Sequence, residues 1–325
     1  MTVSSLGHSP LVTIIGGSGF VGRQIAQRLA WRGWRVRVAC RRPNEAMQVK
    51  PYGDVGQVEP VQCNIRDEAS TRAVIRGADA VINCVGLLSE WGRNTFDSCM
   101  AEGAGRVARI AADEGVAQLV QLSAIGADAA GASRYARAKA AGEAAVAAAF
   151  PQAVILRPSV VFGTDDGFFN RFAGMARLIP LVLPIVGAET KFQPVWVEDV
   201  AEAAARAARG GVAPGVHELG GPTVYTLREV IELMLGVTRR RRLIVNLPFL
   251  AARIQAWFLQ MLPNPLLTVD QVKLLARDNV VSEGARTLAD LGIDPAAAEG
   301  VIEGYLYAYR PQGQYTQLSE NGGEA

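Results

Sequence analysis

The chain has 325 residues, which is long for one small domain and short for two full ones, so we expect one large α/β unit with a smaller appended part. Half of the residues are hydrophobic and 20% are charged, a composition that supplies a buried core and excludes global disorder. The net charge of +2 gives no indication of a nucleic-acid partner. Heavy use of alanine and arginine, with few lysines, is typical of a GC-rich bacterial genome.

The cysteines and histidines give little support to metal or nucleophile chemistry. The cysteines are Cys40, Cys63, Cys84 and Cys99. They lack CxxC spacing and lie at the ends of apolar runs, which favours small buried hydrophobic residues in a reducing compartment over a thiol nucleophile. His8 and His217 lie in no recognisable motif, so we predict neither a metal site nor a Ser-His-Asp triad.

The first ten residues, MTVSSLGHSP, contain no basic segment followed by a long apolar stretch. They therefore predict no secretory signal, and they lack the arginine-rich pattern of an organelle presequence. We expect the protein in the cytoplasm.

Short apolar runs alternate with helical patterns in the first half of the chain, which is typical of repeated βα units and a parallel sheet. The expected strands are 11–15, 36–39, 58–62, 80–84, 119–122 and 153–156. Val21, Ile25 and Leu29 recur every four residues and predict a helix with one apolar face on the sheet. Further helices are expected around 106–113 and over 135–150. The fold class that we predict is α/β, a Rossmann-type doubly wound parallel sheet.

Beyond residue 163 the alternation ends, and we expect a smaller, mostly helical part. Thr226 and Glu229 have the spacing of a capping box and predict a helix over 226–235. The predicted division is a dinucleotide-binding domain over 9–163 with 194–220 returning to it, a C-terminal part over 164–193 and 221–310, and a polar tail over 311–325.

A glycine-rich turn, TIIGGSGFVG, joins the first expected strand to the first expected helix. Gly16 permits the tight turn, Gly19 lets a pyrophosphate approach the backbone, and Gly22 lets the helix pack closely on the sheet. The N–H groups at the helix start then face the anion, and we include Ser18 and Phe20 among the cofactor contacts. A glycine turn without a ligand is the less favoured alternative.

The residues after the second strand select the cofactor. An acidic residue there would favour NAD, but this chain has Arg41 and Arg42, whose guanidinium groups can bind the 2′-phosphate of NADPH. Solvated surface arginines are the alternative. Further cofactor contacts are predicted at Asn64 and Ile65 beside the adenine, at Cys84, Val85 and Gly86 near the middle of the cofactor, and at Pro158.

The segment SRYARAKAAGE carries Tyr135 and Lys139, four residues apart and therefore on one helix face. A lysine ammonium in that position can lower the pKa of the phenol and hold the nicotinamide ribose, so that the tyrosine exchanges a proton while hydride moves. Ser123 ends the fifth strand and can bind the same substrate oxygen. These three are the candidate catalytic residues.

With these motifs in this order, the chain resembles the atypical, extended branch of the short-chain dehydrogenase/reductase superfamily over most of residues 10–310. The longer blocks QLSAIGAD, SRYARAKAAGE, AAFPQAVILRPSVVFG, FQPVWVEDVA and YRPQGQ resemble the nucleotide-binding accessory subunits of respiratory complex I, the NADH:ubiquinone oxidoreductase. That resemblance implies tight NADPH binding in a structural role, away from the electron-transfer path.

Residue by residue, the resemblance extends to the three glycines of the turn, to Arg41 as the residue that meets the 2′-phosphate, and to Tyr135 and Lys139. The extended branch has a run of Ser or Thr at the place where Ser123 is here followed by Ala-Ile. This departure weakens the case for catalysis and leaves cofactor binding untouched.

Residues 239–267 combine a basic cluster with large apolar side chains. Arg239–Arg242 precede Leu243, and then Phe249, Leu250, Ile254, Trp257, Phe258 and Met261 follow at three- and four-residue spacings, as on one face of an amphipathic helix. Interruptions such as Pro248 and Arg253 make a membrane span improbable. We predict that the stretch docks on the cytoplasmic face of the inner membrane; the alternative is a core helix packed on the sheet.

Two functions remain open. The first is a non-catalytic NADPH-holding accessory or assembly protein of complex I, and the block resemblance favours it. The second is a free NADPH-dependent reductase of a carbonyl or quinone-like substrate, which the pair of Tyr135 and Lys139 favours. A sugar-nucleotide epimerase is less favoured because no diphosphate clamp stands out in the C-terminal half. Complex I subunits and the membrane surface are therefore the expected partners.

Overall fold

The computed structural model describes residues 9–261, 265 and 267–313. Contacts divide the chain into two compact units, Met1–Arg157 with Val200–His217, and Pro158–Asp199 with Glu218–Ala325. The division expected from the sequence assigns 158–163, 194–199 and 218–220 to the first unit, whereas their contacts lie with the second. Within the first two of these segments, β7 (Val161–Phe162) and β10 (Val195–Trp196) pair with each other in a small parallel sheet of their own.

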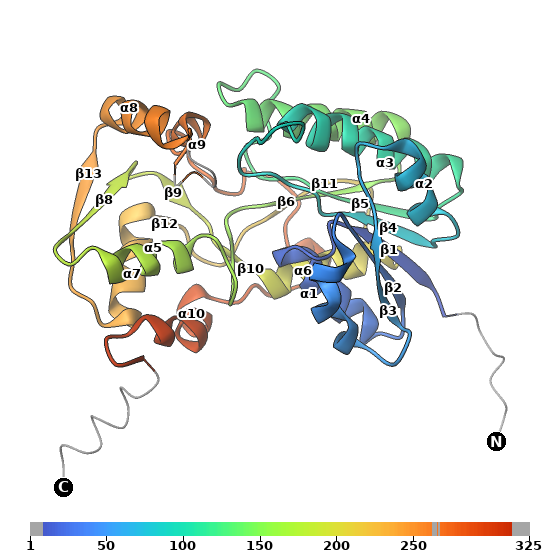
Figure 1. Cartoon of the computed structure of the whole chain (residues 1–325), viewed down its shortest axis with the longest axis horizontal. Helices are drawn as coiled ribbons and strands as arrows, with labels where there is room; N and C mark the ends of the chain where they lie inside the picture. Colours follow the sequence, from blue (N-terminus) through green and yellow to red (C-terminus); the bar gives the residue numbers. More distant parts are fainter. Residues whose placement is uncertain (1–8, 262–264, 266, 314–325) are drawn as a thin grey trace, which may run out of the picture. The chain divides into compact units, whose positions relative to one another are not determined.

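The first unit is built on a seven-stranded sheet in the order β11-β6-β5-β4-β1-β2-β3 (Figure 1). Its strands are β1 (Leu11–Ile15), β2 (Arg35–Cys40), β3 (Val58–Gln62), β4 (Ala80–Asn83), β5 (Gln118–Leu122), β6 (Val154–Pro158) and β11 (Gly215–Leu219). In this order along the sheet, every pair of neighbouring strands from β6 to β3 is parallel. All six strands expected from the sequence are present, and the Rossmann-type prediction is confirmed.

Helices cover both faces of this sheet (Figure 1). On one face lie α2 (Glu68–Ile75), α3 (Glu102–Asp113) and α4 (Arg134–Ala149), which share an apolar core with the sheet. On the other lie α1 (Phe20–Ala30) and α6 (Val197–Ala208). A 3₁₀ segment over Pro43–Tyr52 follows β2, and a π-helical turn over Asp97–Ala101 leads into α3.

A carboxylate on α6 ties this late helix to the first helix of the chain. Glu202 accepts hydrogen bonds from Arg28 at 2.9 Å and Arg32 at 2.5 Å on α1, and from Arg206 at 2.7 Å on its own helix. These three guanidinium groups lower the pKa of Glu202 to about 2 despite its burial. Residues 200–208, far along the sequence, are therefore held to the N-terminal unit by ion pairs as well as by apolar packing.

The second unit combines helices with short two-stranded sheets. Its helices are α5 (Phe169–Leu178), α7 (Leu227–Thr238), α8 (Phe249–Leu259), α9 (Val269–Leu274) and α10 (Ala298–Leu306), with 3₁₀ turns at Ala289–Leu291 and Tyr307–Tyr309. Besides β7 with β10, β9 (Lys191–Phe192) pairs with β12 (Tyr225–Thr226) and β8 (Val182–Val186) with β13 (Leu243–Leu247). The predicted capping box is confirmed, because Thr226 and Glu229 hold each other's backbone N–H groups at the start of α7.

The stretch 239–267 folds as strand β13 followed by helix α8, and its residues 262–264 and 266 lie outside the described residues. Helix α8 buries Ala252 and Ala256 and exposes its large side chains, including Leu250 at 70% and Phe258 at 62%. The alternative of a core helix is therefore wrong, because the wide apolar face points to solvent. No helix among the described residues is long and apolar enough to cross a membrane. Of the expected polar tail, only 311–313 are described.

Candidate functional site

The strand order changes direction between β1 and β4, and ligands of open α/β sheets bind at such a switch point, beyond the carboxyl ends of the strands. Gly16 leaves β1 there with a φ of +78° and donates its N–H to the Ala39 carbonyl of β2 at 2.8 Å. A Cβ at Gly16 would lie 3.2 Å from the carbonyl carbon of Cys84 and from the nitrogen of Val85. The turn therefore passes close against the loop after β4, and glycine is what allows it.

Helix α1 begins directly behind this turn and leaves its first N–H groups open. Its N-cap is Gly19, which has no side chain to cap them, and the first turn, Phe20–Arg23, contains no carboxylate. A Cβ at Gly22 would lie 2.6 Å from the Gly16 oxygen, so only glycine lets the helix start so close to the turn. Gly19 is exposed and Ser18 half-buried. The glycine turn and the start of α1 together fit the pyrophosphate of a dinucleotide, an anion that helix N-termini bind.

The residues after β2 and β3 lie where the sequence analysis places the adenosine end. Arg41 and Arg42 are both exposed directly after β2, and the Arg42 guanidinium pairs with Glu45 at 3.0 Å. An exposed pair of this kind contributes little, so it does not prevent Arg42 from meeting a phosphate. After β3, Asn64 is half-buried and Ile65 is buried, with the Ile65 carbonyl held by Arg106 at 2.7 Å.

A chain of hydrogen bonds joins the loop after β4 to the end of β5. The Val85 N–H donates to the Asn83 oxygen at 3.2 Å, and the Asn83 amide donates to Gln121 at 2.9 Å. Gln121 donates in turn to the Leu122 carbonyl at 2.8 Å. Asn83 and Gln121 are buried, so each lost bond would leave an unsatisfied polar group. This network fixes the loop that carries Cys84, Val85 and Gly86, and sequence reasoning missed it, although polar residues inside apolar strands were its signal.

Lys139 lies at the centre of the site. Its side chain is buried, and its ammonium donates to the same Leu122 carbonyl at 3.3 Å. The Nζ atom lies 3.8 Å from the position that a Cβ on Gly86 would take and 5.8 Å from the centroid of the Tyr135 ring. Burial lowers the pKa of Lys139 to about 8, partly opposed by the charge of Glu143. The structure thus brings Lys139, Tyr135 and the loop after β4 together, as the sequence led us to expect.

The expected activation of the phenol is not present in this arrangement. Burial raises the pKa of Tyr135 to about 12. The Lys139 ammonium lies 5.8 Å from the ring centroid and donates to the Leu122 carbonyl. The ring packs edge-on against Phe96, with centroids 5.8 Å apart. Ser123 is buried after β5, and its hydroxyl has no hydrogen-bond partner among the described residues. A buried hydroxyl of this kind indicates a place for a ligand oxygen.

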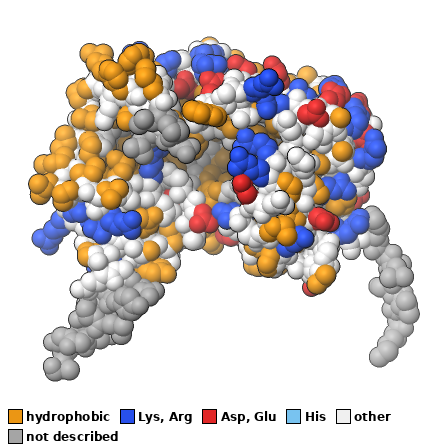
Figure 2. Space-filling model, in the orientation of Figure 1, with side chains coloured by type: hydrophobic (Ala, Val, Ile, Leu, Met, Phe, Trp, Pro, Cys, Tyr) orange, Lys and Arg blue, Asp and Glu red, His pale blue; other side chains and the backbone are white. Residues whose placement is uncertain are grey.

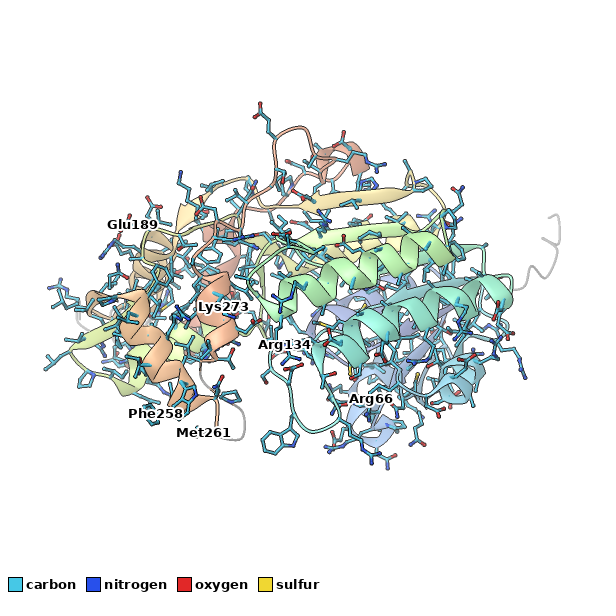
Figure 3. The ribbon with its side chains drawn as sticks, turned by 90° about the horizontal axis from the view of Figure 1, so that it is seen from above. Arg66, Arg134, Glu189, Phe258, Met261 and Lys273 are labelled. Carbon is cyan, nitrogen blue, oxygen red and sulfur yellow. The ribbon has the colours of Figure 1, made fainter. Side chains whose placement is uncertain are left out.

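Two acidic residues that the sequence analysis did not single out support helix α4. Glu143, one turn after Lys139, forms a bidentate pair with Arg157 of β6 at 2.6 and 2.9 Å. Glu90 accepts from the Phe96 N–H at 2.9 Å and from Arg134 at 2.7 Å, which fixes the loop after β4 to the start of α4, where Figure 3 labels Arg134. Pro158 ends β6 and is the first residue of the second unit, so its cofactor contact stays a prediction.

Metal ligands are not gathered at this site. No group of three or more His, Cys, Asp and Glu side chains in the described part of the chain could hold a metal ion. His217 is buried, and its Nε2 lies 2.9 Å from the Ala213 carbonyl. His8 lies outside the described residues.

Comparison with known proteins agrees with this geometry. The sequence profile of the NAD dependent epimerase/dehydratase family matches residues 12–220. The mitochondrial NADH dehydrogenase (ubiquinone) 1 alpha subcomplex subunit 9 of Arabidopsis thaliana is 35% identical over 316 residues, which cover 93% of this chain and 79% of that protein. A ceramide reductase of Caulobacter vibrioides is 33% identical over 191 residues, 59% of this chain and 58% of that protein.

A solved structure shows the same fold at low identity. The NADPH-dependent quinone oxidoreductase QOR2 of Escherichia coli, complexed with NADPH, is 18% identical, with a TM-score of 0.70 over 89% of this chain and 97% of that one. Fold likeness at this identity carries no function, which must be argued from the site. The match to subunit 9 along nearly the whole chain is more specific. The chain therefore belongs to the NAD dependent epimerase/dehydratase family and, within it, to the family of complex I alpha subcomplex subunit 9 proteins.

Proposed function

We propose that this chain is an NADPH-binding accessory protein of the respiratory NADH:ubiquinone oxidoreductase that catalyses no step of its own. The observation that carries the proposal is the 35% identity to a subunit of that enzyme along 93% of the chain. The relative spans both units of this protein, so the likeness is not confined to the nucleotide-binding fold that many enzymes share.

The candidate site supports cofactor binding more strongly than catalysis. The turn at Gly16–Gly22 would hold the pyrophosphate, and Lys139 would hold the nicotinamide ribose. Bound there, NADPH supplies a hydride donor. A reaction would require Tyr135 to exchange a proton, and burial raises its pKa to about 12, so the phenol stays protonated near neutral pH and is a poor base.

We infer a preference for NADPH over NADH from Arg41, which is exposed directly after β2 where a ribose-binding carboxylate would otherwise favour NADH. Arg41→Ala is expected to lower NADPH affinity at least about tenfold, the effect of losing one charge-assisted hydrogen bond. NADH affinity should stay unchanged. Calorimetric titration of both dinucleotides measures this, with Arg209→Ala, an exposed arginine beyond α6, as the matched control. Equal affinity of the parent protein for the two cofactors would contradict the preference.

We further propose that the protein is bacterial and lies on the cytoplasmic face of the inner membrane. Support comes from the alanine- and arginine-rich composition and from the exposed apolar side chains of α8 beside a basic cluster. These features suit a peripheral position at a lipid or membrane-protein surface.

The test is mild detergent solubilisation of membranes from cells that carry a tagged copy of the chain, followed by native electrophoresis. The chain is expected to migrate with NADH:ubiquinone oxidoreductase activity and to retain NADPH after purification. Migration of all of the chain as a small free protein, with the oxidoreductase intact elsewhere on the gel, would refute the accessory role.

A free NADPH-dependent reductase is the second candidate, favoured by the ceramide reductase relative at 33% identity and by the pairing of Tyr135 with Lys139 in the structure. Oxidation of NADPH in the presence of long-chain carbonyl compounds or quinones would be the signature. Activity that is lost in Tyr135→Phe while NADPH stays bound would move the assignment to this candidate.

A further inference from the structure

The second unit contains a basic pocket of about 400 Å³ formed by helix α7 and the segment that leads into β13. Its lining includes Arg228, Arg240, Arg241, Arg242, the carboxylate Glu232 and the apolar Leu243. Four positive charges thus face one negative charge. Arg228 also lies 3.7 Å from Glu189, a long contact between exposed side chains that offsets little of this charge.

Two of these arginines are held by backbone carbonyls and not by carboxylates. The Arg240 Nε donates to the carbonyl of Tyr309 at 2.8 Å, and the Arg242 Nε donates to that of Ala176 at 2.9 Å. Burial and the nearby charges of Arg242 and Arg177 lower the pKa of Arg240. Residues 233–269 contain no Asp or Glu. The cluster therefore holds like charges close together in fixed positions, an arrangement that a bound anion would stabilise.

An exposed apolar surface begins at the rim of this pocket. Leu243, which lines the pocket, is 66% exposed and pairs in register with Val182 of β8, which is also exposed, as is Val245 of β13. Figure 2 shows hydrophobic side chains over β8, β13 and α8, with Lys and Arg side chains along their lower edge.

Helix α8 continues the apolar surface beyond β13. Leu250, Trp257 and Phe258 are each more than half exposed, and Figure 3 shows Phe258 and Met261 on the outer side of the helix. The alanines at 252 and 256 face the unit's own core. Aromatic and leucine side chains exposed beside arginines, with no acidic residue in the stretch, match the chemistry of a phospholipid, whose anionic headgroup is joined to apolar chains.

We propose that the pocket formed by Arg228, Arg240, Arg241 and Arg242 binds the headgroup phosphate of an anionic phospholipid, with its acyl chains against the exposed side chains of β13 and α8. The inference deepens the membrane-surface part of the proposed function and is independent of NADPH. A free phosphate ester shares the headgroup chemistry, but it would leave the adjoining apolar surface uncovered.

The experiment is co-sedimentation of the full-length protein with vesicles of phosphatidylcholine alone and with 30% phosphatidylglycerol. The parent is expected to bind the anionic vesicles at least about 30-fold more tightly, and more weakly in 0.5 M salt. The double variant Arg228→Ser, Arg241→Ser leaves Arg240 and Arg242 in place, which donate hydrogen bonds to backbone carbonyls. It should weaken this binding roughly 30-fold, since two basic residues near an anionic surface each contribute about fivefold. Arg76→Ser with Arg209→Ser, exposed arginines of the first unit, is the control of equal charge and should change it little.

A second variant tests the apolar part. Leu250→Ser with Phe258→Ser alters two exposed side chains, so folding is preserved, and binding to both kinds of vesicle should fall. Equal binding of the parent to neutral and anionic vesicles overturns the headgroup pocket. Arginine-dependent binding of glycerol 3-phosphate without vesicle binding assigns the pocket to a soluble phosphate and overturns the lipid. Absence of vesicle binding by a chain that still migrates with the oxidoreductase overturns this inference alone and indicates a protein surface as the occupant.

Discussion

At the scale of single residues, Lys139 and Tyr135 differ in what their surroundings favour. The Lys139 ammonium is buried beside the loop after β4 and held by the Leu122 carbonyl, a position from which it can bind a ribose hydroxyl. Burial raises the pKa of the Tyr135 phenol to about 12. The ammonium is therefore placed to bind a cofactor, while the phenol stays protonated near neutral pH.

Substitution of the two residues should have unequal effects on the cofactor. Tyr135→Phe is expected to leave NADPH affinity within about twofold of the parent, because the ring keeps its packing against Phe96. Lys139→Ala should weaken NADPH binding by at least about tenfold, since a charge-assisted hydrogen bond is lost. Fluorescence titration of NADPH measures both. Equal losses in the two variants would show that the tyrosine hydroxyl also binds the cofactor.

The pKa of Lys139 predicts a pH-dependent stability. Burial lowers it from 10.5 to about 8, so between these values the unfolded chain keeps a proton that the native protein has lost. The unfolded state then binds more protons, and this residue's contribution to the free energy of unfolding rises with pH by about 1.4 kcal/mol per unit. Below pH 8 both states are protonated, and the contribution is constant.

Urea denaturation of cofactor-free protein from pH 7 to 10, in parallel with Lys139→Met, checks this. The difference in free energy of unfolding should shift in favour of the parent by about 2 kcal/mol over the window. A difference that stays flat from pH 7 to 10 would mean that Lys139 titrates near its ordinary value.

At the scale of elements, helices α1 and α7 differ in what satisfies the N–H groups of their first turns. Helix α7 closes its own first turn with the capping box of Thr226 and Glu229. Helix α1 has Gly19 as its N-cap, and its N–H groups are left for another acceptor. The uncapped start costs helix stability, which a bound pyrophosphate restores.

Adding one methyl group to this turn should be costly. In Gly22→Ala, the new Cβ would lie 2.6 Å from the Gly16 oxygen and 2.7 Å from the Gly17 Cα, both backbone atoms. The variant is expected to lose about 1–3 kcal/mol of stability and most of its NADPH affinity. Gly236→Ala in α7 meets no atom within 4 Å and should gain up to about 1 kcal/mol. Thermal denaturation compares the two, and a Gly22→Ala protein as stable as the parent would show that the turn has room.

At the scale of the whole molecule, the chain divides into a unit that carries the glycine turn and a unit that carries the basic pocket. The two candidate ligands therefore stabilise different parts. Binding of NADPH at 100 times its dissociation constant contributes about 2.7 kcal/mol to the unit that holds it.

Hydrogen exchange with and without saturating NADPH tests this division. We expect slower exchange at 16–22 and 84–86 and no change in β13 and α8. The same experiment with NADH at equal concentration is the control for cofactor choice. Protection confined to the second unit would place the nucleotide away from the glycine turn and contradict the site.

The sequence by itself determined the parts of this protein that depend on local pattern. Short apolar runs that alternate with helical patterns predicted the first six strands, and the Thr226–Glu229 spacing predicted the start of α7. The turn at Gly16 was predictable from the spacing of its glycines between a strand and a helix, and the positive φ of Gly16 is a local reason for glycine there. These features need only neighbours in the chain.

The tertiary structure alone decided the features that depend on distant partners. The pairing of β7 with β10 moved the unit boundary, and the exposure of Leu250 and Phe258 excluded a core helix, because periodicity shows that a helix has an apolar face but not what covers it. The pKa of Tyr135 was likewise beyond the sequence. The YxxxK spacing places a lysine beside the phenol, but whether its charge or the burial of the ring dominates depends on where the ammonium points and what surrounds the ring.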